Sequence, residues 1–101
     1  MKINPEFISE FIKLKLKENT IIESASGDAR YKIIDVSDNN IKYVRLDAES
    51  ELFESIQFQV FQEIIMNSMQ EATINTTSIK KYISGKQSPC IAIMKYSGLI
   101  K

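Results

Sequence analysis

Histidine and tryptophan are absent from the 101-residue chain, and cysteine occurs once, as Cys90. Without histidine, the protein lacks the usual general base of enzymes and the commonest protein ligand for metals. One cysteine cannot close an internal disulfide, and a cysteine zinc site needs partners that the chain does not have. These absences exclude the most frequent catalytic and metal-binding chemistries. A lone thiol also fits a reducing compartment, so we expect a cytoplasmic protein in which Cys90 is buried and inert.

Glycine and proline are scarce, with three and two residues, which argues against a chain dominated by loops. No hydrophobic run approaches the roughly 18 residues that a membrane-spanning helix needs. The N-terminal segment contains acidic residues and does not resemble a signal peptide. A length of 101 residues with 44% hydrophobic content is sufficient for one core and not for two. We therefore expect residues 1–101 to form a single compact domain that does not enter a membrane.

Acidic residues are missing from the last thirty positions. All thirteen aspartates and glutamates lie at or before Glu71, so the first 71 residues, with eight basic side chains, have a net charge of −5. The remaining residues carry five lysines and no acid, which gives them a net charge of +5. Such an asymmetry indicates an anionic partner, or the docking of one half of the molecule on the other.

Hydrophobic periodicity predicts an α+β fold with an N-terminal helix, a four-stranded antiparallel β-meander and three C-terminal helices. The first helix begins at Asn4 and Pro5, a capping residue followed by a proline that fits the first turn, and it ends near Asn19. Alternating residues then predict short strands separated by turn residues, and a helical period returns in the last third. The strands are predicted over 20–25, 30–36, 41–46 and 51–56, and the C-terminal helices over 58–71, 77–84 and 89–97.

The C-terminal helices resemble a helix–turn–helix in outline. A short turn containing Gly85 joins the helices predicted over 77–84 and 89–97, and Gly98 is followed by two apolar residues, as at the entry to the wing of a winged variant. This resemblance rests on spacing. Residues 90–94 are almost continuously apolar, whereas a recognition helix needs an exposed polar face.

Other constellations have simpler structural explanations. The segment 84–88 contains a Gly-Lys pair without the spacing of a phosphate-binding P-loop, and the end of one helix followed by the start of another explains it better. Acidic clusters at 35–38 and 49–54 lie in predicted turns and at a strand edge, where solvated carboxylates are common. We therefore expect no catalytic residue, no cofactor and no metal ion.

The basic C-terminal third is the remaining candidate for a functional site. We expect a small non-enzymatic module that binds nucleic acid, or a regulatory accessory protein, with the C-terminal helices contacting phosphate. A solvated face that keeps the domain soluble explains the same residues equally well. The expected contacts are Lys80, Lys81, Lys86, Gln87, Ser88 and Lys95.

A surplus of apolar helix surface supports an alternative, a protein–protein interaction or assembly domain. The helix predicted over 58–71 places two phenylalanines and Met69 on one face. A small sheet can cover a limited area, so exposed apolar faces would form a homodimer or a partner interface. The first helix carries apolar residues over about half of its circumference, namely Phe7, Ile8, Phe11, Ile12, Leu14 and Leu16.

Overall fold

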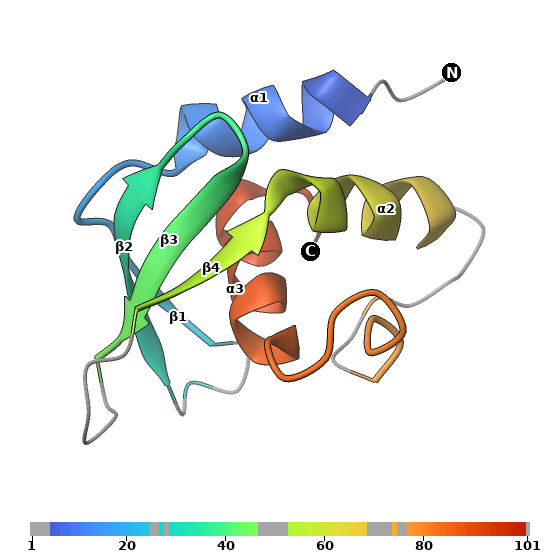
Figure 1. Cartoon of the computed structure of the whole chain (residues 1–101). Helices are drawn as coiled ribbons and strands as arrows, with labels where there is room; N and C mark the ends of the chain where they lie inside the picture. The colour runs from blue at the N-terminus through green and yellow to red at the C-terminus, as the bar shows by residue number, and fades with distance from the viewer. Residues whose placement is uncertain are drawn as a thin grey trace.

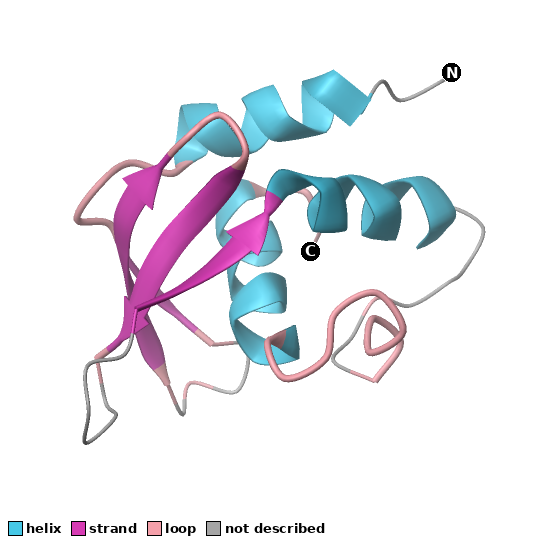
Figure 2. Ribbon diagram, viewed as in Figure 1, coloured by secondary structure: helices cyan, strands magenta, loops and turns pink. Residues whose placement is uncertain are grey.

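The computed structural model shows a four-stranded sheet with helices packed on one of its faces (Figure 1; Figure 2). It describes residues 5–24, 27, 29–46, 53–68, 74 and 77–100. The α+β class is therefore confirmed. Within the described ranges the elements, in chain order, are α1 (Pro5–Lys15), β1 (Ile21–Glu23), β2 (Arg30–Val36), β3 (Asn40–Arg45), β4 (Phe53–Gln57), α2 (Phe58–Ser68) and α3 (Gln87–Ser97).

The strands form an antiparallel meander in the order β1-β2-β3-β4. The predicted strand over 30–36 has the same bounds in the structure, because alternating apolar residues and two flanking turns define it. The β2–β3 turn is closed by Ser37, whose hydroxyl bonds the backbone carbonyl of Asn40 at 3.1 Å. The first strand is shorter than predicted and ends at Glu23, and the last ends one residue later, at Gln57. Residues 25, 51 and 52 of the predicted strands lie outside the described residues.

The N-terminal helix is confirmed, but it ends at Lys15 and not near Asn19, and the expected cap at Asn4 lies outside the described residues. Its apolar residues divide between two faces. Ile8 and Ile12 are buried, and so is Leu16, which follows the helix and still bonds the carbonyl of Ile12 at 2.8 Å. Phe7 and Leu14 are exposed. The core therefore uses one face of α1, in keeping with the i, i+4 spacing of the buried residues.

The helix predicted over 58–71 corresponds to α2, with positions 69–71 outside the described residues. The last helix begins two residues earlier than predicted. Its N-cap is Lys86, without a side-chain capping bond, so Ser88, the residue before the predicted start, lies inside the helix. Gly98 closes α3 as predicted: it has a φ of 87°, and its N–H bonds the carbonyl of Lys95. This left-handed conformation is open to glycine at little cost.

The described residues 77–84 do not form the predicted helix. The first helix of the helix–turn–helix outline is therefore missing. The segment 77–82 is a series of turns. The N–H of Tyr82 bonds the carbonyl of Ile79 three residues earlier, and the N–H of Ile83 bonds the same carbonyl with helical spacing. So short a segment gains too few bonds to offset helix nucleation, and the fully buried Ile79 holds it to the core instead.

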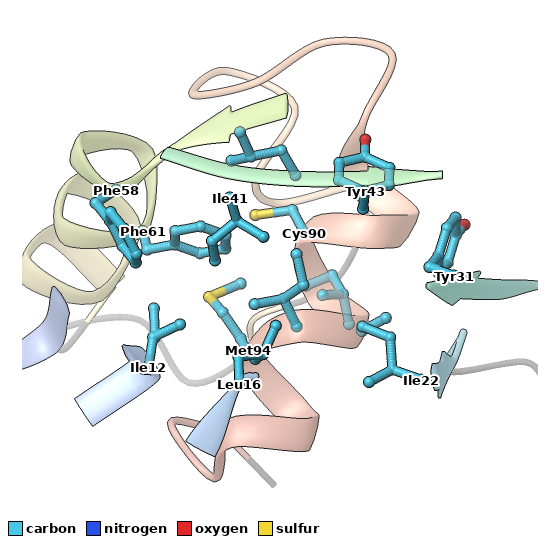
Figure 3. Packing of buried hydrophobic residues seen from close by; sticks show 14 of the residues in the cluster. Ile12, Leu16, Ile22, Tyr31, Ile41, Tyr43, Phe58, Phe61, Cys90 and Met94 are labelled. Carbon is cyan, nitrogen blue, oxygen red and sulfur yellow. The ribbon is translucent and has the colours of Figure 1, made fainter. Parts of the chain in front are cut away.

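One hydrophobic core joins all of these elements (Figure 3). Phe61 from α2, Ile41 from β3 and Met94 from α3 meet at its centre, each with 2% exposure or less. Tyr31 and Tyr43 contact each other edge to face on the sheet, with ring centroids 5.7 Å apart. Because α3 lies between the sheet and the other helices, most of its surface is buried.

Candidate nucleic-acid interface

The six residues predicted to contact phosphate do not share one element. Lys80 and Lys81 are exposed on the turns of segment 77–82, and Lys95 is exposed near the end of α3. Lys86, Gln87 and Ser88 lie together at the start of α3. Lys86 and Lys95 are nine positions apart in the chain, which corresponds to about 14 Å along the helix axis. The structure therefore groups the middle three residues and places the others apart.

Helix α3 cannot act as the recognition helix of a helix–turn–helix. Its buried residues are Pro89 to Met94 and Ser97, so little polar surface remains for a nucleic-acid groove. The continuous apolar run that argued against this motif in the sequence is a buried core segment. Among the described residues, the candidate contacts that remain are the side chains at the start of α3, the turns before it, the exposed Lys95 and the sheet.

Lys86 is held at the outer edge of the sheet. Its side-chain nitrogen donates a hydrogen bond of 2.9 Å to the backbone carbonyl of Ser55 in β4. The N–H of Phe58 bonds the carbonyl of Asn39 across β3 and β4. In an antiparallel sheet, hydrogen-bonded and non-hydrogen-bonded pairs alternate. Ser55, paired with Lys42, is therefore in a non-hydrogen-bonded pair, and its backbone N–H and carbonyl point away from β3. Lys86 therefore lies beside the strand at the end of the sheet.

Ser88 is also tied to the sheet. Its hydroxyl oxygen accepts a hydrogen bond of 3.3 Å from the hydroxyl of Tyr31 in β2. Tyr31 is buried, whereas Ser88 is exposed. The start of α3 is thus fixed against the sheet from two sides, and the positions of Lys86 and Ser88 are set by the fold.

The face of the sheet opposite the helices carries one row of side chains across all four strands. Ile21, Lys32, Val44 and Phe53 are successive partners in the register of the strands. The residues that alternate with them, such as Ile22 and Tyr43, point into the core. Ile21 and Phe53, at the two ends of the row, are 52% and 56% exposed. An aromatic ring is therefore accessible on this face.

A lysine lies over that ring. The side-chain nitrogen of Lys42 is 5.2 Å from the centroid of Phe53. Lys42 is paired with Ser55 and is thus the diagonal neighbour of Phe53 across β3 and β4. Asp35 is the register partner of Lys42 on the other side, yet the ammonium group is placed over the ring.

The described positions of this face carry more basic than acidic side chains. The register of the strands and the alternation of their side chains place five charged residues on this face. The first 71 residues, which include the sheet, are acidic overall. Lys86, at the edge beside Ser55, adds a further positive charge. These charged residues are Arg30, Lys32 and Lys42, with Glu23 and Asp35.

Cys90 and Tyr43 have protonation properties that do not suit catalysis. Burial raises the pKa of the Cys90 thiol to about 12, so the reactive thiolate is scarce at neutral pH. Burial, together with the hydrogen bond that its hydroxyl donates to Glu54 at 3.0 Å, raises the pKa of Tyr43. Cys90 is therefore buried, as the sequence indicated.

Two further features, a metal site and a membrane span, were sought among the described residues. Within the described ranges no three cysteine, aspartate or glutamate side chains are grouped so that they could hold a metal ion. No helix in the same part of the chain is long and apolar enough to cross a bilayer.

A depression of about 400 Å³ lies between α1, the β2–β3 turn and the start of α2. It contains the hydrogen bond of 2.7 Å from the side-chain amide of Gln62 to the Ser9 hydroxyl. The Ser9 hydroxyl is bonded to Gln62 and the Asp38 carboxylate is paired with Lys13 at 3.6 Å, so we assign the depression no chemistry.

Comparison with protein families, with curated proteins and with solved structures gives no match for this chain. The site therefore has to be interpreted from its own geometry. The site predicted from the sequence includes Lys86 but not Lys32, Lys42 and Phe53, because the proximity of these three residues depends on the register of three strands. The strand alternation that places Lys42 opposite to Ile41 and Tyr43 was a signal that could have indicated Lys42.

Proposed function

We propose that the protein is a small non-enzymatic module that binds single-stranded nucleic acid on the open face of its sheet. The observation that carries this proposal is the pair formed by Lys42 and Phe53, an exposed aromatic ring with an ammonium group 5.2 Å from its centroid. Bases of any sequence stack on aromatic side chains, and lysines beside the ring neutralise the adjacent phosphates.

The neighbourhood of this pair supports an extended contact. Lys32 lies two positions from Phe53 in the same row, and Lys86 lies at the outer edge of β4, beside Ser55. A strand of nucleic acid crossing this face would meet Lys32, Lys42 and Lys86 around one stacking ring. This arrangement retains Lys86 from the sequence-based site and moves the centre of the site to the sheet.

The direct test is the fluorescence anisotropy of a labelled single-stranded oligonucleotide of about twelve nucleotides. We expect Phe53→Ala to lower affinity by roughly tenfold, because stacking contributes about 1–3 kcal/mol per base. Phe53→Leu, which keeps an apolar side chain without the ring, should lose nearly as much. A Phe53→Ala protein that binds as tightly as the wild type would refute the stacking site.

Salt dependence tests the phosphate contact. The slope of log K against log salt concentration changes by about 0.7 for each contact to a single strand. We expect Lys42→Gln to reduce the slope by about this amount. Lys15→Gln, the loss of an exposed lysine from α1, is the matched control and should leave the slope unchanged.

A further variant distinguishes binding by the sheet face from binding by the C-terminal lysines. The Lys80→Glu/Lys81→Glu protein should lose binding if the turns before α3 form the contact, and should keep most of it if the sheet does. Loss of binding in this variant, combined with full binding by Phe53→Ala, would place the interface on the C-terminal segment instead. A duplex of the same sequence, which cannot offer unstacked bases, should bind more weakly than the single strand.

A further inference from the structure

The ring of Phe53, on which a base is proposed to stack, already holds a positively charged group. The side-chain nitrogen of Lys42 lies over the ring, 5.2 Å from its centroid. An ammonium group within roughly 6 Å of a ring centroid is attracted by the negative face of the ring. Phe53 is 56% exposed and so remains open to solvent beside this contact. A base that approaches the ring therefore competes with Lys42 for the same surface.

The burial of Val44 shows how the ring is seated on the sheet. Val44 lies on the open face, yet it is only 6% exposed. Its register partners on the two neighbouring strands are Lys32 and Phe53. The β-carbons of directly paired residues are about 5 Å apart, so these two side chains are the nearest cover for Val44. One side of the Phe53 ring is therefore turned towards the sheet, and a ligand reaches the ring from its outer side.

Lys42 can change its partner at little cost. Its register partner on β2 is Asp35, and both side chains are exposed. Ion pairs and cation–π contacts between exposed groups are both weak, so neither the carboxylate nor the ring fixes the ammonium group in place. Hydrogen bonds from an ammonium group to phosphate are among the stronger ones in proteins. A strand of nucleic acid on this face therefore gives Lys42 a better partner than the ring.

We propose that Lys42 controls access to the stacking site. It covers the outer side of the Phe53 ring until a single strand binds, and it then moves to a phosphate of that strand while a base takes its place on the ring. This inference rests on the proposed function and adds a step to it. The step is the rotation of one exposed side chain between β3 and β4, which lie side by side in the sheet (Figure 1).

The exchange makes the site selective for strands with a charged backbone. A ligand that carries both a base and a phosphate replaces the contact that it breaks. A ligand that carries bases on a neutral backbone breaks the contact between Lys42 and Phe53 and offers the ammonium group no anion in return. The ligand class is therefore narrowed to strands in which a phosphate lies next to the stacked base.

The two contacts of Lys42 have opposite effects on affinity, and a salt titration distinguishes them. The logarithm of the association constant falls linearly with the logarithm of the salt concentration, and its value at 1 M leaves out the release of counterions. For a labelled single strand of about twelve nucleotides, we expect Lys42→Gln to bind about two- to fivefold more tightly than the wild type at 1 M, because no ammonium group has to leave the ring. At roughly 50 mM the wild type should bind more tightly, because it makes one more phosphate contact, so the two lines cross.

Lys32→Gln is the matched control. It removes a positive charge from the same face, at the register partner of Val44, and leaves Lys42 on the ring. We expect it to lower the salt slope without raising the affinity at 1 M. If Lys42→Gln bound no more tightly than Lys32→Gln at 1 M, the inference would be wrong. The proposed function would still stand in that case, because it fails by a different result, equal binding of Phe53→Ala and the wild type.

Nuclear magnetic resonance tests the contact directly in the protein without nucleic acid. The ring current of Phe53 should move the signals of the ε-methylene protons of Lys42 upfield in the wild type relative to Phe53→Leu. Saturation with the oligonucleotide should return these signals towards their positions in Phe53→Leu. Equal signals in the two proteins before the oligonucleotide is added would overturn the inference, because Lys42 would then not lie over the ring. An upfield shift that persisted in the complex would also overturn it, because the base would then not displace Lys42.

Discussion

The side-chain nitrogen of Lys86 lies 2.9 Å from the backbone carbonyl oxygen of Ser55, on the outer edge of β4. An edge strand presents backbone groups that can pair with another chain, and a lysine on the edge opposes such pairing. Lys86 comes from the start of α3 and so joins two distant parts of the chain. It both fixes that helix to the sheet and protects the edge.

We expect Lys86→Met to lower the free energy of unfolding by about 1 kcal/mol, because a hydrogen bond from a charged donor is lost at a half-exposed site. The variant should also aggregate faster on mild heating, since the edge of β4 becomes accessible. Urea denaturation and light scattering measure the two effects. Lys95→Met removes an exposed lysine from α3 and is the control; equal behaviour of the two variants would contradict a protective role for Lys86.

A second prediction concerns two apolar residues that lie two positions apart in α1. Ile12 is fully buried, whereas Leu14 is 73% exposed. We expect Ile12→Ala to lower the free energy of unfolding by about 2–5 kcal/mol, because it leaves a cavity in the core. Leu14→Ala should change it by less than about 0.5 kcal/mol in dilute solution. Chemical denaturation at low protein concentration measures both, and a large loss in Leu14→Ala would mean that its side chain supports the monomer.

The difference in burial between Ile12 and Leu14 could not be predicted from the sequence. Periodicity located α1 and predicted its apolar content, but it could not decide which apolar residues the core would use. That choice depends on how α1 crosses α2 and α3, which local sequence does not specify. The same limit applies to the segment 77–84, where a helical pattern is too short to form a helix and is held as turns by Ile79.

The strands were easier to predict than the candidate site built on them. Alternation and turn residues defined β2 to the residue, because both act locally. The approach of Lys42 to Phe53 requires the register of β3 on β4, which depends on contacts eleven residues apart in the chain. Lys86 could be predicted as a basic residue near a helix start, but its bond to Ser55 depends on the whole fold.

A third prediction concerns the end of α3. Gly98 has a φ of 87°, and a side-chain carbon placed there would meet Phe11 at the ordinary contact distance of 3.7 Å. The penalty for Gly98→Ala should therefore come from the backbone, and we expect it to be about 1 kcal/mol. Gly98→Asn should lose less, because asparagine tolerates the left-handed conformation. Thermal denaturation of the two variants distinguishes the causes: if the larger asparagine side chain were the more harmful, contact with Phe11 would be limiting.

The last prediction concerns how the buried thiol of Cys90 makes the free energy of unfolding depend on pH in alkaline solution. Its pKa is about 12 in the folded protein and 9.0 when it is unperturbed. Below pH 9 both states keep the proton, so this group adds no pH dependence. Between these two pKa values the unfolded chain releases a proton that the folded chain keeps, and stability falls by up to about 1.4 kcal/mol per pH unit.

The Cys90→Ala variant isolates this effect, because Tyr43, whose pKa is also raised, is present in both proteins. At about pH 8 the wild type should be the more stable, since alanine leaves a cavity in the core. As the pH rises from 9 towards 11, the difference in the free energy of unfolding should shrink by as much as about 1.4 kcal/mol per unit. Urea denaturation at each pH measures it. Parallel curves for the two proteins would mean that the thiol ionises as easily in the folded state as in the unfolded chain.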